Sequence, residues 1–76
     1  MEKDYIEKIK ELRIDNDLTQ VELSKKIGLS PAAYGLYETR QRHMDIETFV
    51  RICKLFDVSA DFLLNLPLKD IQTAKK

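Results

Sequence analysis

The sequence predicts an all-α protein, a compact bundle of five short helices. Three features of the 76 residues favour this class. Apolar residues recur at intervals of three and four, which is helical spacing, and not at the interval of two that marks strands. Only two glycines and two prolines are present, so there are few places for hairpin turns. A composition of 43% hydrophobic and 34% charged residues is typical of one small globular domain.

Charge and composition exclude several classes of function. Thirteen basic residues balance thirteen acidic ones, so any surface that binds anions must concentrate its cations locally. The single cysteine, Cys53, excludes an internal disulfide and a cysteine-rich zinc site, and we expect it to be a buried thiol. The lone histidine, His43, makes a histidine metal cluster or a catalytic dyad improbable. The sequence therefore predicts no enzyme, no metal and no cofactor.

No segment of the sequence indicates a membrane or an export signal. The N-terminus is charged and mixed in sign, and the apolar runs are far shorter than the roughly 20 residues of a membrane span. We expect a cytoplasmic protein with no membrane partner.

The first two helices are predicted from their end signals. A helix over 4–16 begins at Asp4, because negative charge is favoured at a helix N-terminus. Thr19 and Glu22 form a capping box, which starts a second helix of about eight residues. Gly28 follows its last turn, where a left-handed backbone is common.

Three more caps predict the remaining helices. Ser30 with Pro31 starts a third helix over 30–38, on which the side chains of Tyr34 and Tyr37 share one face and are expected in the core. A polar loop follows over 39–44. Asp45 starts a fourth helix and Ser59 a short fifth one. The fourth helix carries an expected core stripe of Ile46, Phe49, Val50, Cys53 and Phe56.

The junction between the second and third helices has the spacing of a helix-turn-helix unit. The two helices cross closely, which requires a small residue, and Ser24 is small. The turn needs a positive φ, which Gly28 adopts without steric cost. The outer face of the third helix is then free to enter a DNA major groove.

Several motifs in this order resemble the lambda-repressor-like helix-turn-helix domain, the group of phage repressors, Cro-type proteins and xenobiotic-response-element regulators. They cover roughly residues 6–66 and comprise Leu12-Arg13, Leu18-Thr19-Gln20-x-Glu22-Leu23, Ile27-Gly28-Leu29-Ser30, Tyr37-Glu38 and Phe56-x-Val58-Ser59-x-Asp61-x-Leu63-Leu64. We expect a DNA-binding domain over 1–66, followed by an extension over 67–76 that is either flexible or in contact with a second subunit.

The resemblance implies roles for individual residues. Gln20, helped by Thr19, would hold a DNA phosphate and brace the third helix, and Arg13 with Glu38 would form an internal ion pair. The surface facing DNA would consist of Ser30, Pro31, Ala32, Ala33, Gly35 and Leu36, which offers few hydrogen bonds to bases. Leu36 is equally open to a protein contact. The loop residues Thr39, Arg40, Gln41, Arg42 and His43 would contact phosphates, or one arginine would enter a minor groove. Arg40 stands where the family usually has glycine.

The resulting hypothesis is a transcriptional repressor that binds a palindromic operator as a homodimer through the helix at 30–38. Its partner is double-stranded DNA, and Phe62, Leu66 and Leu68 are either core or dimer surface. One alternative is an antitoxin or autoregulator whose main partner is another protein. A second alternative is a scaffold that no longer binds DNA and serves only for protein interactions.

Overall fold

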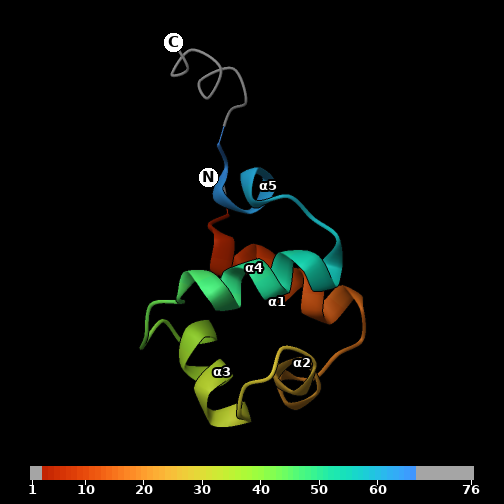
Figure 1. Ribbon diagram of the computed structural model, residues 1–76, viewed down its shortest axis with the longest axis vertical. Helices are drawn as coiled ribbons and strands as arrows, with labels where there is room; N and C mark the ends of the chain where they lie inside the picture. The colour runs from red at the N-terminus through yellow and green to blue at the C-terminus, as the bar shows by residue number, and fades with distance from the viewer. Residues whose placement is uncertain (1–2, 67–76) are drawn as a thin grey trace.

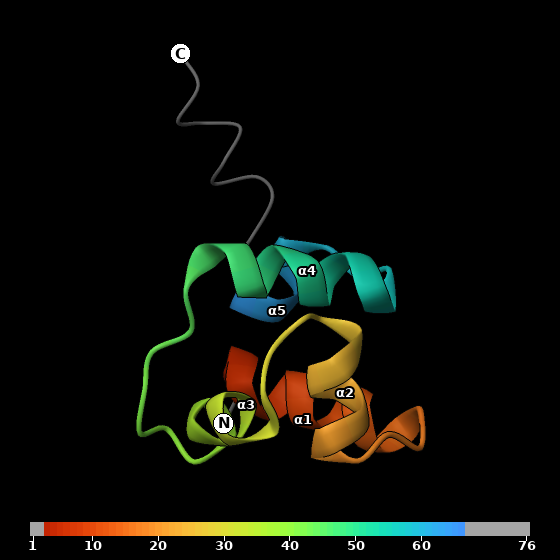
Figure 2. The same cartoon turned by 60° about the horizontal axis from the view of Figure 1, so that its bottom comes forward.

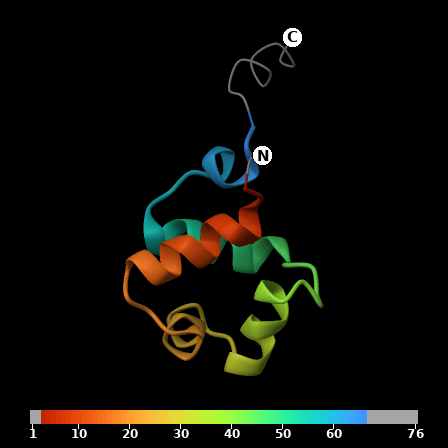
Figure 3. The same ribbon diagram turned by 180° about the vertical axis from the view of Figure 1, so that it is seen from behind.

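The computed structural model describes residues 3–66, and within them it contains five α-helices and no strand. The helices are α1 (Tyr5–Asp15), α2 (Gln20–Lys26), α3 (Pro31–Glu38), α4 (Ile46–Phe56) and α5 (Ala60–Leu64). Helices α1 and α4 lie across the middle, with α2 and α3 on one side of them and α5 on the other (Figures 1 and 3). The all-helical prediction is therefore confirmed. Over 3–66, no helix combines the length and the apolar character that crossing a bilayer requires.

Four of the five helices begin directly after the cap that the sequence predicts, and α1 begins one residue after Asp4, where the sequence places its start. Each of the five cap side chains accepts a hydrogen bond from the backbone N–H of the third residue of its helix, and they are Asp4, Thr19, Ser30, Asp45 and Ser59. At α2 the capping box is complete, because Glu22 also accepts from the backbone N–H of Thr19 at 2.9 Å. These bonds satisfy donors that a helix start otherwise leaves unpaired, which fixes where each helix begins.

Two small residues lie in and before the turn that joins α2 to α3. Ser24 is fully buried, and its hydroxyl donates to the carbonyl of Val21 at 2.7 Å, so its polar atom is satisfied. Gly28 has φ +77°, the left-handed conformation that turns the chain between the two helices. Arg51 of α4 then donates to the carbonyl of Ile27 at 2.9 Å and ties the turn to α4.

The core is formed by residues from every helix. Its buried apolar members are Ile6, Ile9, Leu23, Ile27, Tyr34, Tyr37, Phe49, Ile52 and Leu63. Tyr5 packs edge-on against Phe49, with their ring centroids 5.9 Å apart, and this contact joins the start of α1 to α4. Cys53 is only partly buried, and burial raises the pKa of its thiol.

The predicted core stripe of α4 is wrong in part. Ile46 is 74% exposed and Val50 is 41% exposed, whereas Ile52, outside the stripe, is fully buried. At about 100° per residue, the buried side of α4 is centred on Phe49, Ile52 and Phe56, and Ile46 and Val50 fall on its edge. They line a shallow apolar groove with Leu64 of α5.

Candidate nucleic-acid interface

Helix α3 presents one face to the core and the opposite face outward. The side chains of Tyr34 and Tyr37 point inward and are 0% and 5% exposed. The outward residues of α3 and its cap are exposed or half-buried, and they are Ser30, Pro31, Ala32, Ala33, Gly35 and Leu36. The side chains of this face are small and nearly all apolar, so they offer methyl groups and the Ser30 hydroxyl to a partner.

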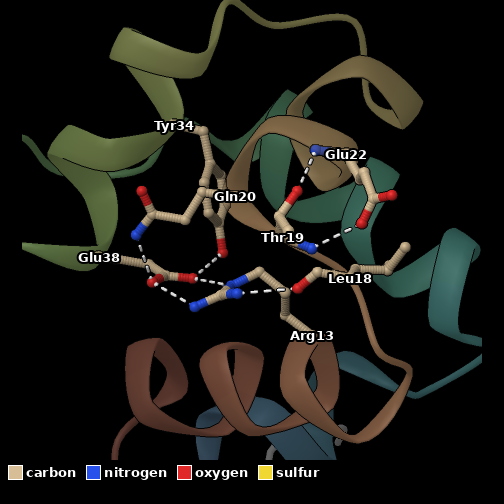
Figure 4. A network of polar contacts seen from close by, with 7 residues as sticks. All are labelled: Arg13, Leu18, Thr19, Gln20, Glu22, Tyr34 and Glu38. Carbon is tan, nitrogen blue, oxygen red and sulfur yellow. Dashed lines mark hydrogen bonds and ion pairs between the residues drawn. The ribbon is translucent and has the colours of Figure 1, made fainter.

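Helix α3 is held in place by a network around the carboxylate of Glu38 (Figure 4). Arg13 of α1 makes a two-pronged ion pair with it, with Nε 2.8 Å from Oε2 and Nη2 3.1 Å from Oε1. The Tyr34 hydroxyl donates to Oε2 at 2.5 Å, and the Gln20 amide donates to Oε1 at 2.8 Å. The guanidinium of Arg13 also donates to the carbonyl of Leu18 at 2.8 Å. One carboxylate thus joins α1, α2 and α3.

Burial and hydrogen bonding together set the charge states in this network. The side chains of Arg13 and Glu38 are only 12% and 5% exposed. Burial opposes ionisation of Glu38, but hydrogen bonds from Arg13, Tyr34 and Gln20 outweigh it and hold its pKa below the usual value. Burial, together with the bond to Glu38, raises the pKa of the Tyr34 hydroxyl. At neutral pH the network therefore consists of a carboxylate, a guanidinium and a protonated phenol.

Gln20 and Thr19 lie at the start of α2, next to α3. The Gln20 amide points inward to Glu38, which matches the bracing role that the resemblance implies. Thr19 is exposed, and its hydroxyl accepts the backbone N–H of Glu22 at 3.0 Å. A phosphate contact by either residue stays a prediction. The bond from Gln20 to Glu38 spans 18 residues, and no local pattern predicts it.

Gly35, in the middle of α3, is not required by the fold. A Cβ placed there would lie 3.6 Å from Oε1 of Gln20, which is an ordinary contact. Replacing Gly35 with alanine should therefore raise the free energy of unfolding by roughly 0.5–1 kcal/mol, because glycine is a poor helix former. Urea unfolding followed by circular dichroism measures this difference. The matched control is Gly28→Ala, which should destabilise the protein because Gly28 has φ +77°. If Gly35→Ala were no more stable than the wild type, α3 would need this glycine.

The loop after α3 begins with a left-handed residue that is not glycine. Arg40 has φ +64°. Its backbone N–H donates to the carbonyl of Tyr37 at 3.1 Å, and that of Gln41 donates to the carbonyl of Leu36 at 2.9 Å. These two bonds form the helix-ending motif in which glycine is usual. Arginine keeps this geometry at a conformational cost of roughly 1–2 kcal/mol.

The side chain of Arg40 is paired with Asp4, the cap of α1. Its Nη1 and Nη2 atoms lie 2.5 Å and 3.0 Å from Oδ2 and Oδ1 of Asp4. Hydrogen bonds from Arg40 and from the backbone of Glu7 lower the pKa of Asp4 to about 2. The sequence predicts a phosphate contact for Arg40 and gives no sign of this pair, because its members are 36 residues apart.

The rest of the loop is exposed and polar. Thr39, Gln41, Arg42 and His43 are all exposed, and the Thr39 hydroxyl donates back to the carbonyl of Gly35 at 3.0 Å. Arg40, Arg42 and His43 line a hollow of about 260 Å³ with Tyr5, Ile6 and Tyr37. The cations that the sequence singles out therefore gather on one side of the molecule, beside the C-terminal end of α3.

The expected dimer residues lie on and after α5. Phe62 is 52% exposed and Leu66 is 47% exposed, so neither is a core residue, while Leu68 lies outside the described residues. The ammonium group of Lys8 lies 4.4 Å from the centre of the Phe62 ring and 2.6 Å from the Phe62 carbonyl oxygen.

Comparison with known proteins agrees with this geometry. The chain is 34% identical over 62 residues to the HTH-type transcriptional regulator YobD of Bacillus subtilis (strain 168), and this match covers 82% of the chain and 55% of YobD. It is 37% identical over 60 residues to the HTH-type transcriptional regulator YqaE of the same organism, covering 79% of the chain and 52% of YqaE. The chain thus spans about half the length of these curated relatives.

A solved structure shares the fold. The P22 c2 repressor protein, crystallised in complex with the synthetic operator 9T, superposes with a TM-score of 0.74 at 24% identity, over 87% of this chain and 100% of the repressor chain. Residues 9–63 also match the family described as Helix-turn-helix. The chain therefore belongs to the helix-turn-helix family of the lambda-repressor and Cro type, whose members are DNA-binding regulators.

Proposed function

We propose that the chain is the DNA-binding part of a transcriptional repressor, which binds a palindromic operator as a homodimer and reads it with α3. The observation that carries this proposal is the orientation of α3. Its tyrosines are buried, the neighbouring helix α2 buries Leu23 and Ser24, and the small residues of α3 are exposed or half-buried. A helix presented in this way fits the width of a major groove.

The small residues of α3 limit how DNA is read. A two-pronged contact from a side chain to a base contributes about 1–3 kcal/mol of discrimination, and alanine, glycine and proline cannot make one. Ala32, Ala33 and Leu36 can contact thymine methyl groups, and Gly35 lets the backbone approach a base or sugar closely. Selectivity then depends on these contacts together with the shape of the DNA.

The phosphate contacts are assigned to the start of α2, with Thr19 and Gln20, and to the loop after α3, with Arg40, Arg42 and His43. Gln20 contacts Glu38, the last residue of α3, and the loop begins directly after it. This clustering supports DNA binding by a chain whose net charge is zero, because the cations act locally. It also implies modest affinity for DNA of unrelated sequence.

Two arguments support a homodimer. One α3 helix makes few selective contacts, and two half-sites about one helical turn apart double them. Exposed apolar side chains on and beside α5, among them Phe62, Leu64 and Leu66, supply a surface for a second copy. The names of the curated relatives and the operator bound to the P22 c2 repressor support the regulatory role.

Selection of bound duplexes from a random pool tests this function. We expect a consensus of two inverted half-sites, with log affinity falling against log salt with a slope near −5, as about three phosphate contacts per subunit require. Replacing Arg42 with alanine should weaken binding to all sequences and make this slope shallower by about 1 for each phosphate contact that is lost. The fold should be unaffected, since the side chain of Arg42 is exposed.

The outcome separates the parts of the proposal. A single half-site would contradict the homodimer, and retention of DNA that does not depend on salt or on Arg42 would contradict the assigned surface. Gly35→Ala adds an independent check, because we expect it to weaken operator binding while it stabilises the fold. Equal operator binding by Gly35→Ala would place the duplex away from the middle of α3.

A further inference from the structure

The pair of Asp4 and Arg40 joins the start of α1 to the loop that leaves α3, and these two segments lie beside one another (Figure 2). Both prongs of the guanidinium are used, with distances of 2.5 Å and 3.0 Å to the two carboxylate oxygens of Asp4. The two side chains remain about half exposed, at 50% for Arg40 and 47% for Asp4. The pair is therefore open to solvent and to any other anion that approaches the loop.

A DNA phosphate would use the same atoms of Arg40. Phosphate and carboxylate both accept two parallel hydrogen bonds from a guanidinium, so they compete for its prongs. The Cα atom of Arg40 stays in place during this exchange, because its backbone is held by the hydrogen bonds that end α3. Arg42 borders the same hollow, so a phosphate at this place would meet two guanidinium groups.

We propose that Asp4 is a built-in competitor of DNA: its carboxylate holds Arg40 in the free protein and is exchanged for a backbone phosphate when a duplex binds to α3. This inference rests on the DNA-binding function proposed above. The start of α1 contacts no base in this proposal. Its role is to set the affinity of the loop after α3 for DNA.

The exchange of partners does not break the cap of α1. Oδ1 of Asp4 also accepts the backbone N–H of Glu7 at 3.0 Å and so caps α1 without help from Arg40. An ion pair that is this exposed contributes little to stability, so separating its members is not a barrier to binding. This small free-energy cost is subtracted from the affinity for DNA.

The substitution Asp4→Asn isolates the carboxylate charge. Asparagine caps a helix about as well as aspartate, so α1 should form as before. We expect Asp4→Asn to bind the selected operator about two- to five-fold more tightly per subunit, which is the range for the loss of one exposed ion pair. Fluorescence anisotropy with a labelled duplex, at two or more salt concentrations, measures this change.

Two further variants show whether Asp4 acts through Arg40. Arg40→Asn removes the guanidinium, and asparagine tolerates the left-handed backbone at this position. In the Arg40→Asn background, the gain from Asp4→Asn should vanish. Asp15→Asn, at the far end of α1, makes the same change in net charge and should leave affinity nearly unchanged.

Each result decides between the possibilities. If the wild-type chain shows no salt-dependent binding, the proposed function fails and this inference fails with it. If the wild-type chain binds but Asp4→Asn binds no more tightly, only the competition is overturned. If the gain persists without Arg40, Asp4 repels DNA directly and the exchange is likewise overturned.

Discussion

Replacing Glu38 with alanine should lower the free energy of unfolding by about 3–5 kcal/mol. This is the largest loss of stability that we expect from replacing a single polar side chain in this protein. The substitution leaves the guanidinium of Arg13, which is only 12% exposed, without its counter-charge. It also removes the acceptor of the Tyr34 hydroxyl and of the Gln20 amide. Domains of this size have only a few kcal/mol of net stability, so the variant should be largely unfolded near 37 °C. Thermal and urea unfolding measure the loss.

Two control variants separate charge from packing. The double change of Arg13→Met with Glu38→Leu removes both charges and should recover much of the lost stability, because no unpaired ion remains. Glu38→Gln keeps one acceptor oxygen and should fall between the wild type and Glu38→Ala. A loss below about 1 kcal/mol for Glu38→Ala would mean that the pair behaves as if it were exposed to solvent.

The same carboxylate has a defined dependence on pH. The pKa of Glu38 is lower in the folded protein than in the unfolded chain, so folding favours its ionised form. Its contribution is complete above the unfolded pKa, which is about 4.3, and is lost as the pH falls through the folded pKa. The difference in stability between the wild type and Glu38→Gln should therefore shrink on acidification below about pH 4.

Local signals predicted the helices because caps act over three or four residues. Thr19 with Glu22, Ser30 with Pro31, and Gly28 each specify their own backbone geometry, and each helix begins where its cap places it. Periodicity located the core less accurately. Ile46 and Val50 have the spacing of buried residues, but the side of α4 that is covered depends on how α4 crosses the other helices, which no local pattern encodes.

In the candidate site, too, local features can be predicted from the sequence and long-range contacts cannot. The outward face of α3 follows from the spacing of its two tyrosines, which is local. The contacts of Gln20 with Glu38 and of Arg40 with Asp4 span 18 and 36 residues, and they arise only when the helices pack. The resemblance to a family supplied the pair of Arg13 and Glu38, but it offered nothing for Asp4. The contact of Asp4 with Arg40, which no local pattern and no family motif indicates, is therefore found from the structure alone.

Placing a carboxylate on the outer face of α3 gives the second large effect. We expect Ala32→Glu to weaken operator binding at least about a hundred-fold, because each subunit would bring a negative charge against the phosphates, and a juxtaposition of like charges costs several kcal/mol. Ala32 is exposed, so the larger side chain meets no part of the protein core. Anisotropy titrations with the selected operator measure the loss.

The two charged substitutions at Ala32 have opposite effects on the helix and on DNA. Ala32 lies in the first turn of α3, where the helix dipole favours negative charge and disfavours positive charge. Ala32→Glu should therefore be as stable as the wild type or slightly more stable, yet it should lose DNA. Ala32→Lys should be slightly less stable, yet it should retain DNA and bind unrelated sequences more tightly.

Lys54→Gln, in the last turn of α4, is the control for net charge. It changes the net charge by as much as Ala32→Glu does and should alter the affinity for DNA far less. Because unfolding cannot produce this reversed pattern, equal binding by both Ala32 variants would mean that α3 does not face the duplex.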